Sequence, residues 1–375
     1  MRIATRVTTM CLVVAGGTAL AAARSDAPDA RGMRFGAAPV QSLGAMTFGP
    51  DGTLFIADPR GAALFAFDPS DKGTATYGEQ YLSRDIDQKV AAALGTTRDR
   101  VRFNDMAVNP ISHNIFLTVS RVDGDTKPAL IRLSGSDAVE VVDLSHVKFA
   151  TTPLPEAPSP DGKTPWGQPQ WTLSVTHMAF ADGELLVAGL SNEQFASALR
   201  RVPFPFSKAA SINTVEIYHT SHNKWETAAP IEAFVPITIG GTPMIVAGYG
   251  CSPIATFKRA DLASTKHLRG RTVAELGGGN RPIDIIRYQR DGKEWILVAN
   301  SHRTLMRIDP SLIAAAPEMT KPVSQAYEPG GVTYLPVASA GVMQIDDFNS
   351  DFVAVLQRDI ESGAVNLMAL QKRWL

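Results

Sequence analysis

A surplus of either charge is missing from this sequence. Among its 375 residues, Lys and Arg number 36 and Asp and Glu number 37, so the formal net charge is -1. Nucleic-acid-binding proteins usually carry a basic excess, and proteins held on anionic lipid carry a polybasic patch. We therefore expect neither nucleic acid nor a charged membrane surface among its partners.

Long apolar runs are scarce, and the clearest one lies at the N-terminus. The stretch MCLVVAGGTALA, residues 10–21, is too short to span a bilayer. It follows Arg2 and Arg6 and ends in an A-x-A cleavage pattern, as secretory signal peptides do. We predict a cleaved signal peptide over residues 1–23, a linker over 24–33, and a periplasmic or secreted mature protein without a membrane anchor.

Cysteine is nearly absent. The chain has two cysteines, and Cys11 lies in the predicted signal peptide, so Cys251 has no partner for an intrachain disulfide. Two interpretations of Cys251 are open. Free cysteines are often small buried core residues, which is the interpretation we favour. A reactive thiol would instead need an exposed, electropositive setting.

Several catalytic signatures are also missing. The sequence contains no G-x-S-x-G elbow, P-loop, C-x-x-C-H haem site or H-E-x-x-H motif. His219 and His222 are three residues apart, but they fall in a predicted outer strand or turn, where we expect the two side chains to point to opposite faces. We therefore expect no zinc site at this pair.

What the sequence does contain is a repeat of three short strands. The first strands all carry Met or Ile at their second position, and they read AMTF (45–48), DMAV (105–108), HMAF (177–180), PITI (236–239), PIDI (282–285) and VMQI (342–345). The third strands are spaced by roughly 50 to 70 residues, as four-stranded blades with variable loops require. The pattern predicts an all-β, six-bladed β-propeller over residues 34–375, with four-stranded antiparallel blades around a central channel. We expect RFGAAPVQSL, residues 34–43, to pair with the last blade and close the ring.

Two insertions interrupt the repeat. Residues 85–95 have the acidic start and glycine end of a short amphipathic helix. Residues 151–171 form a Pro-rich loop that contains Trp166 and Trp171. Long loops in a compact domain are either functional lids or insertions without a function. Exposed tryptophans favour the first interpretation, in which this loop covers a bound ligand and the tryptophans contact it.

Candidate ligand-binding residues come from reading the repeat as a column. Residues at or just before the innermost strands reach one mouth of the channel. The column brings together Asn104, Asp105, His177 and Arg281, with Arg102 nearby. The strand alternation adds Asp284 and Gln344 near the channel, although a register error of one residue would reverse this. Asp105 could instead satisfy backbone N–H groups, and His177 could be a hydrogen-bonded structural histidine.

The blade rhythm resembles the six-bladed propellers that include NHL-repeat proteins, strictosidine-synthase-like proteins and gluconolactonases. The segment RFND, residues 102–105, is similar to a gluconolactonase segment that supplies substrate-binding Arg and Asn. The resemblance implies this role for Arg102 and Asn104. It also implies Ca²⁺ or another divalent cation, for which Asn104 and Asp105 would be partial ligands. The first blade offers only Gly44 and Ala45 where that family has an acidic ligand.

Three functions follow as hypotheses. The first is an exported propeller that binds a small molecule or a periplasmic protein at one channel mouth, without catalysis. The second is a divalent-metal-dependent hydrolase or lactonase that uses the mouth residues. The third is an accessory role in periplasmic redox metabolism, which no residue in this sequence specifically supports.

Overall fold

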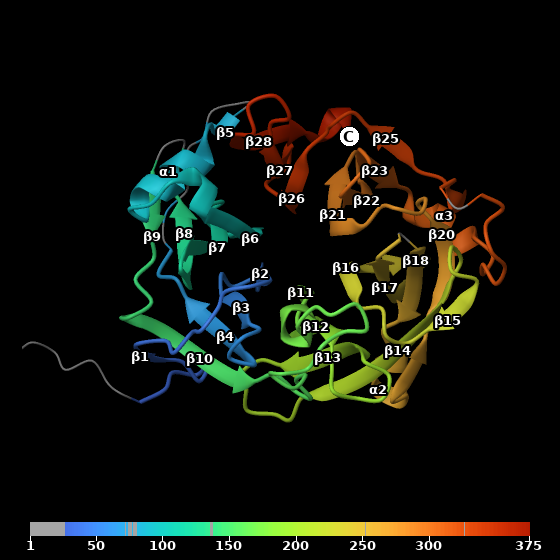
Figure 1. Cartoon of the computed structure of the whole chain (residues 1–375), viewed down its shortest axis with the longest axis horizontal. Coiled ribbons are helices and arrows are strands. Elements are labelled where there is room, and N and C mark those ends of the chain that lie inside the picture. Colours follow the sequence, from blue (N-terminus) through green and yellow to red (C-terminus); the bar gives the residue numbers. More distant parts are fainter. Residues whose placement is uncertain are drawn as a thin grey trace, which may run out of the picture.

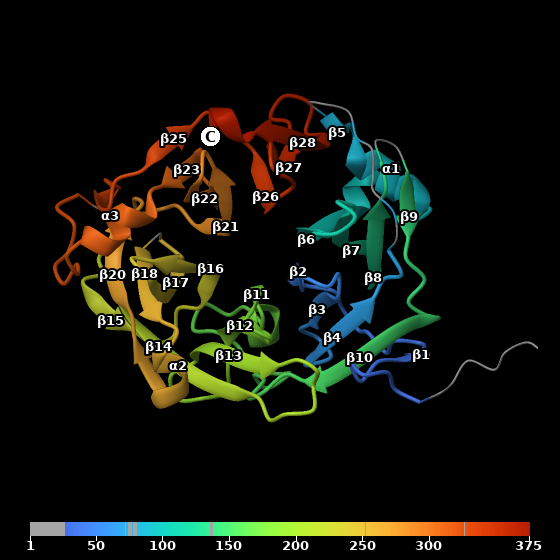
Figure 2. The same ribbon diagram turned by 180° about the vertical axis from the view of Figure 1, so that it is seen from behind.

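Short apolar strands joined by tight turns make up most of the chain, which the computed structural model describes over residues 27–375 except 72, 74–76, 78–80, 136–137, 252 and 326. The predicted signal peptide and its cleavage site lie outside the described residues. Among the residues that are described, no helix has the length and apolar character needed to cross a membrane. The strands form six sheets around a central opening (Figures 1 and 2).

Each sheet is one blade, and we number the blades by the sequence order of their innermost strands. From the channel outward, blade 1 contains β2 (Met46–Phe48), β3 (Leu54–Asp58), β4 (Ala63–Asp68), β10 (Val147–Pro153) and β1 (Arg34–Gly36). Blade 2 contains β6 (Val101–Val108), β7 (Ile115–Asp123), β8 (Asp125–Leu133) and β9 (Val139–Val141). Blade 3 contains β11 (His177–Ala181), β12 (Glu184–Leu190), β13 (Ser197–Pro203), β14 (Ser211–His219) and β15 (Lys224–Glu226), and β19 (His267–Arg269) runs parallel to β14.

The other three blades are built in the same way. Blade 4 contains β16 (Ile231–Ile239), β17 (Thr242–Tyr249), β18 (Pro253–Lys258), β20 (Arg271–Glu275) and β24 (Gly330–Gly331). Blade 5 contains β21 (Pro282–Arg290), β22 (Lys293–Asn300), β23 (Leu305–Ile308) and β25 (Leu335–Val337). Blade 6 contains β26 (Val342–Asp347), β27 (Phe352–Arg358), β28 (Val365–Gln371) and β5 (Tyr81–Ser83). The described residues therefore confirm the predicted six-bladed all-β fold.

Two-residue turns set the register of several inner hairpins. Asp182 and Gly183 join β11 to β12 with φ of 51° and 79°, and Asp291 and Gly292 join β21 to β22 with φ of 52° and 72°. Positive φ at both turn positions matches the twist of antiparallel strands and favours Asp-Gly pairs. The register places alternate side chains of each strand against the neighbouring blades.

The blades do not follow the chain around the ring. The inner strands contact one another in the order β6, β2, β11, β16, β21, β26, and β26 returns to β6 (Figure 1). Blade 1 therefore lies between blades 2 and 3. After β4 the chain adds β5 to blade 6, continues into blade 2, and returns through β10 to the outer part of blade 1.

The ring is closed by β5, and not by residues 34–43 as the sequence predicted. Ser83 pairs with Leu367 of β28, so a strand from early in the chain becomes the outer strand of the last blade. Residues 34–36 form β1, whose Arg34 pairs with Phe149 of β10 at the edge of blade 1. The prediction failed because a short polar strand carries no sequence signal that identifies its partner.

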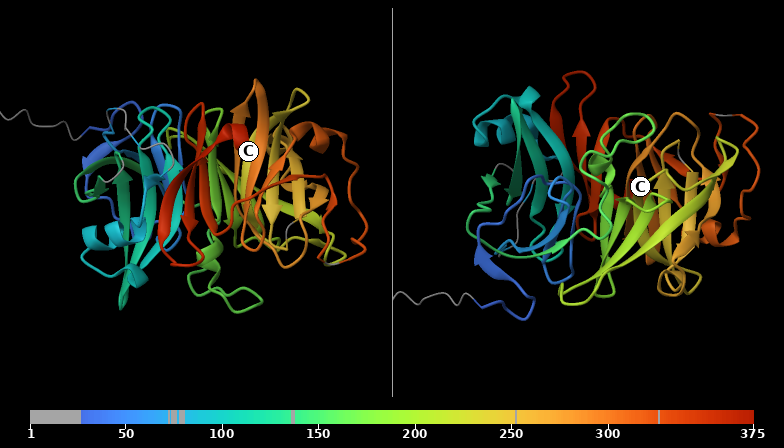
Figure 3. Two further views of the ribbon diagram at one scale, coloured as in Figure 1. Left: turned by 90° about the horizontal axis from the view of Figure 1, so that it is seen from above. Right: turned by 60° about the horizontal axis from the view of Figure 1, so that its bottom comes forward.

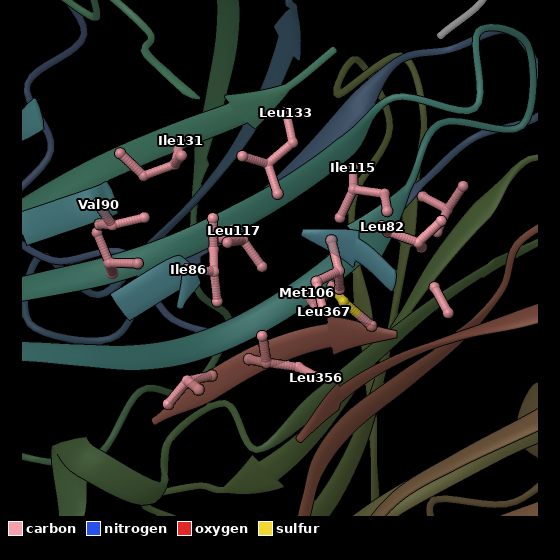
Figure 4. Packing of buried hydrophobic residues seen from close by; sticks show 14 of the residues in the cluster. Leu82, Ile86, Val90, Met106, Ile115, Leu117, Ile131, Leu133, Leu356 and Leu367 are labelled. Atoms are coloured by element: carbon pink, nitrogen blue, oxygen red, sulfur yellow. The ribbon is translucent and has the colours of Figure 1, made fainter. Parts of the chain in front are cut away.

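Apolar clusters fill the spaces between neighbouring blades, and the described residues give one cluster for each of the six interfaces. Figure 4 shows the cluster between blades 2 and 6, where Leu117 of β7, Leu356 of β27 and Leu367 of β28 meet. Full burial of one such side chain stabilises the fold by about 1.5–3 kcal/mol. The clusters fix the ring order independently of the backbone pairing.

The three α-helices of the described residues lie at the margins of the ring (Figure 1), whereas one of the 3₁₀ turns contributes to the channel mouth. They are α1 (Ile86–Ala93), α2 (Asp261–Ser264) and α3 (Pro310–Ala315), with 3₁₀ turns η1 (Arg98–Arg100), η2 (Gln170–Leu173) and η3 (Lys372–Trp374). Helix α1 falls within the stretch where a helix was predicted, and its Ile86 and Val90 pack into the cluster of Figure 4.

The Pro-rich loop is shorter than predicted. Residues 151–153 belong to β10, and residues 170–173 form η2. Figure 3 shows the segment between them as a green loop that projects from one end of the ring.

Candidate functional site

One mouth of the central channel is a cavity of about 910 Å³. Every blade contributes to its lining, which includes Ser42, Leu43, Arg60, Arg102, Phe103, Asn104, Asp105, Trp171, His177, Glu232, Arg281, Ile283, Met343 and Gln344. A cavity of this size, with apolar walls and a few polar groups, is typical of a small-molecule binding site.

β-bulges direct four of these side chains to the mouth. The pairing between the inner strand and its neighbour shifts by one residue at Asn104, Glu232, Ile283 and Met343. A bulge places one extra residue in a strand and re-aims its side chain. Four different blades thus present the bulged residue to the same cavity.

The structure brings most of the residues predicted from the sequence to this mouth. The cavity lining includes Arg102, Asn104, Asp105, His177, Arg281 and Trp171, together with Gln344. Asp284 is not on the lining surface, but its Oδ1 lies 3.3 Å from Nε2 of His177. Trp166 is 59% exposed, bonds Gln168 in the same loop, and is not part of the lining.

Asp105 joins the inner strands of two blades. One carboxylate oxygen accepts a hydrogen bond of 2.7 Å from the N–H of Met46 in blade 1, and the other accepts one of 2.8 Å from Met106 in its own strand. Charge-assisted hydrogen bonds from buried N–H groups stabilise the fold more than neutral ones do. The geometry supports the structural interpretation of Asp105.

Two more aspartates repeat this arrangement around the channel. Asp346 of blade 6 accepts a hydrogen bond of 2.7 Å from the N–H of Val108 in blade 2. Asp284 of blade 5 accepts one of 2.9 Å from the N–H of Ile345 in blade 6. The three carboxylates link blades 5, 6, 2 and 1 in ring order, and we call them the inter-blade aspartates.

Burial changes the protonation of two inter-blade aspartates. Burial and the nearby charge of Asp284 raise the pKa of Asp105 to about 7. Burial, opposed by the hydrogen bond from Val108, raises the pKa of Asp346 to about 8. Near neutral pH the floor of the channel is therefore less negative than its carboxyl groups suggest.

His177 lies at a constriction of the channel. It lines the mouth cavity and also a second cavity of about 770 Å³ on its other side. Its ring meets Phe234 edge to face at 5.1 Å. Nδ1 is buried and has no hydrogen-bond partner within the described part of the chain. A ligand that reaches the constriction could bond this nitrogen.

Arginines from three blades stand at the rim. Arg60, Arg102 and Arg281 are all exposed. The guanidinium of Arg60 lies 5.6 Å from the ring centre of Trp171. Nε of Arg281 is 4.0 Å from Oε2 of Glu232, at the limit of an ion pair. The Arg102 side chain has no hydrogen-bond or ion-pair partner among the residues that the structure describes.

Glu232 is a lining residue that the sequence analysis missed. Burial raises its pKa, and the positive charge of Arg281 opposes this rise. The repeat pattern predicts that the inner strand of blade 4 begins at Pro236, whereas β16 begins at Ile231. The apolar alternation of IEAFVPITI already extends back to Ile231, so the signal was present.

The mouth fits a divalent cation poorly. Both Asp105 oxygens accept backbone N–H groups, and the Asn104 amide nitrogen donates to Leu43 O and Ser120 Oγ at 2.8 and 2.9 Å. Where the resembling family has its acidic first-blade ligand, blade 1 has Gly44 and Ala45, which offer no ligand side chain. The ligand set implied by the resemblance is not assembled here, and the cation on Asn104 and Asp105 stays a prediction.

No family model matches the sequence, and no curated protein matches it. Among solved structures, the chain is similar to a putative oxidoreductase (glucose dehydrogenase) from Thermus thermophilus, with 11% identity, 90% of this chain and 98% of that chain covered, and a TM-score of 0.38. It is similar to a protein described as a putative gluconolactonase, with 8% identity, 92% of this chain and 94% of that chain covered, and a TM-score of 0.31. It is also similar to the PQQ-bound aldose sugar dehydrogenase of Streptomyces coelicolor, with 12% identity, 90% and 96% coverage and a TM-score of 0.31. Likenesses this distant carry no argument about the site.

Proposed function

We propose that this protein binds a small organic anion in the mouth cavity. The observation that carries the proposal is Arg102, an exposed guanidinium on the cavity lining without a hydrogen-bond or ion-pair partner among the described residues. A guanidinium presents a planar fork of donors that matches a carboxylate, so an unpaired one beside a cavity favours an anionic ligand.

The balance of charge at the rim supports the same class of ligand. Arg60, Arg102 and Arg281 face two lining carboxyl groups, Glu232 and Asp105. Burial raises the pKa of both carboxyl groups, so their negative charge is reduced relative to exposed acids. The rim is therefore positive on balance near neutral pH.

The walls indicate that the anion has an apolar body. Leu43, Phe103, Trp171, Ile283 and Met343 all contribute to the lining. The guanidinium of Arg60 lies 5.6 Å from the ring centre of Trp171, so a ligand whose apolar body contacts the indole would bring its carboxylate close to Arg60. An aromatic or branched aliphatic carboxylate fits these walls best.

We propose binding without catalysis because the carboxylate oxygens near the mouth already accept backbone hydrogen bonds. The inter-blade aspartates are occupied by backbone N–H groups, and a metal-dependent hydrolysis would need a cation site that the mouth does not assemble. We therefore do not propose the hydrolase function. The accessory redox role stays a prediction.

Export is the second component of the proposal, and the N-terminal sequence supports it. Expression of the full chain in a Gram-negative host should yield a periplasmic protein that lacks residues 1–23. Intact-mass measurement and cell fractionation would check this. A cytoplasmic product that keeps its N-terminus would contradict it.

The binding proposal is tested with matched acids and amides. Three pairs separate charge from shape: phenylacetate and phenylacetamide, 4-hydroxybenzoate and 4-hydroxybenzamide, and succinate and succinamide. At least one acid should raise the melting temperature while its amide does not, because a ligand stabilises the state that binds it. Arg102→Gln should remove the shift, and Arg373→Gln, at an exposed arginine outside the cavity lining, should keep it. Equal shifts with acid and amide would contradict the proposal.

A further inference from the structure

A cluster of metal-ligating side chains lies apart from the mouth lining. His219 ends β14, His222 lies in the turn before β15, and Cys251 lies in the turn after β17. One ligand atom from each residue can be chosen so that all three atoms lie within 4.8 Å of one another. The two imidazole rings are 4.0 Å apart between centroids.

This arrangement corrects the expectation for the histidine pair. The sequence pattern predicts a strand or turn in which His219 and His222 point to opposite faces. The strand instead ends at His219, and the hairpin pairs His219 with Lys224, so the turn folds His222 back over His219. Cys251 is half-buried, and its φ of 58° lies in the left-handed region. It is therefore not a fully buried core residue.

A carboxylate orients both imidazoles. Nδ1 of His219 contacts Oε2 of Glu226, and Nδ1 of His222 lies 3.0 Å from Oε1 of the same side chain. Histidines that bind metals commonly donate one ring N–H to a carboxylate, which leaves the other nitrogen free for the metal. Glu226 thus directs Nε2 of both rings away from itself.

His219 offers an unused buried nitrogen. Its side chain is only 2% exposed, and Nε2 has no hydrogen-bond partner within the described residues. A buried polar atom without a partner destabilises the fold unless something bonds it. A metal ion coordinated by Nε2 would supply the missing interaction.

The backbone around the cluster is held in place by blades 3 and 4 together. Thr220 Oγ1 donates a hydrogen bond of 2.5 Å to Glu275, whose backbone pairs with Pro253 two residues after Cys251. Thr272 Oγ1 donates one of 2.7 Å to the carbonyl of Tyr218. These contacts fix the histidine turn of blade 3 against the cysteine turn of blade 4 before any ion binds.

We propose that His219, His222 and Cys251 bind a zinc ion. Zinc takes imidazole nitrogen at about 2.0–2.1 Å and thiolate sulfur at about 2.3 Å, so small side-chain rotations would close a three-ligand set within 4.8 Å. The Cys251 thiol releases its proton on binding. The His222 side chain is 43% exposed, so the site is open to solvent, and a water or an external ligand can take the fourth position.

The site is distinct from the anion cavity, although it is near it. Neither histidine nor Cys251 belongs to the cavity lining. A β-carbon built on Gly250, the residue before Cys251, would lie 3.5 Å from Oε1 of Glu232. The ion would therefore connect blades 3 and 4 beside the mouth, and its binding can be tested separately from that of the anion.

Zinc binding is measured on the intact protein. Chelator-stripped protein should bind about one zinc ion per chain by isothermal titration and retain it on dialysis. Cys251→Ser and His222→Gln should each weaken binding by at least about tenfold, and Glu226→Gln by about 10–100-fold. The exposed His146 provides the control variant His146→Gln, which should bind zinc like the wild type.

Cobalt supplies a readout of ligand identity. Co²⁺ should give a thiolate-to-cobalt charge-transfer band in the wild type that is absent from Cys251→Ser. Both ligand variants concern partly exposed residues, so the folded state is checked by circular dichroism before titration. Zinc affinity that is unchanged in both variants would overturn the proposal. Retention of copper but not zinc would overturn the assignment to zinc.

Discussion

At the scale of single residues, the inter-blade aspartates show how one side-chain type can be structural while resembling a catalytic group. Asp105 and Asp346 have raised pKa values near neutrality, a property often found in active sites. Their oxygens nevertheless accept backbone N–H groups from a neighbouring blade. Buried carboxyl groups around a propeller channel can therefore serve to hold the blades together.

The raised pKa of Asp346 predicts a pH-dependent stability. Its pKa is about 8 in the folded state, above the ordinary value near 3.9, so the folded state holds the proton that the unfolded state has lost. The stability from this group is complete below about pH 4 and declines as pH rises towards 8. Asp346→Asn keeps a neutral side chain at every pH, so its stability relative to the wild type should rise by up to about 1.4 kcal/mol per pH unit between pH 5 and pH 8.

Urea unfolding of the wild type and Asp346→Asn at pH 5, 6, 7 and 8 would measure this difference. The free energy of unfolding of the wild type should fall relative to that of Asp346→Asn as pH rises. A difference that does not change with pH, or that moves in favour of the wild type as pH rises, would show that Asp346 does not retain a proton in the folded state.

Some of the residues at the channel mouth could be predicted from the sequence, and others could not. The column of strand starts identified Arg102, Asn104, His177 and Arg281, because each first strand carries a recognisable apolar pattern. It missed Glu232, because Pro236 resembles a strand start. The contact between His177 and Asp284 joins two blades and depends on the bulge in β21, which no single strand pattern encodes.

At the scale of elements, β5 has a role that exceeds its length. This three-residue strand covers the outer edge of β28 and places Leu82 in the apolar cluster between blades 2 and 6. Leu82 is 1% exposed. Its side chain packs where the last blade of the chain meets blade 2.

Leu82→Ala should therefore destabilise the protein by about 2–5 kcal/mol, the usual cost of a leucine removed from a packed core. Leu312→Ala is the matched control, because Leu312 is 42% exposed on α3. Guanidinium unfolding measures both variants. Similar, small losses for the two would mean that β5 does not close the ring as described.

At the scale of the whole molecule, the number of blades could be predicted and their order could not. Six repeats of an apolar strand pattern determine how many blades exist, because each pattern needs its own hairpin partners. The order depends on β5 and β10, two strands that leave their local repeat to complete a distant blade. A strand that completes a distant blade leaves the apolar pattern of its own repeat unchanged, so the sequence does not show which blade it joins.

The ring order predicts a specific energetic coupling. Phe55 of blade 1 stacks on Phe180 of blade 3 with ring centroids 5.1 Å apart, which a ring that followed the chain order would not allow. A double-mutant cycle with Phe55→Ala and Phe180→Ala should give an interaction energy of about 0.5–3 kcal/mol. Phe55→Ala combined with Ile360→Ala, at a residue that is 76% exposed in blade 6, should be additive. Additivity in the first pair would contradict the ring order.

The proposed anion site at the channel mouth can be tested by a single set of titrations. Isothermal titration would use the strongest-binding acid of the three matched pairs with the wild type, Arg102→Gln, Arg281→Gln and the double variant. Each substitution should weaken binding by about 10–100-fold, because hydrogen bonds to charged groups contribute about 1.5–3 kcal/mol. The two effects should be non-additive, because both arginines line one cavity and would contact the same ligand. Equal binding of the acid to all four proteins would show that the two arginines do not form an anion site. Failure of all three acids to bind the wild type would show the same.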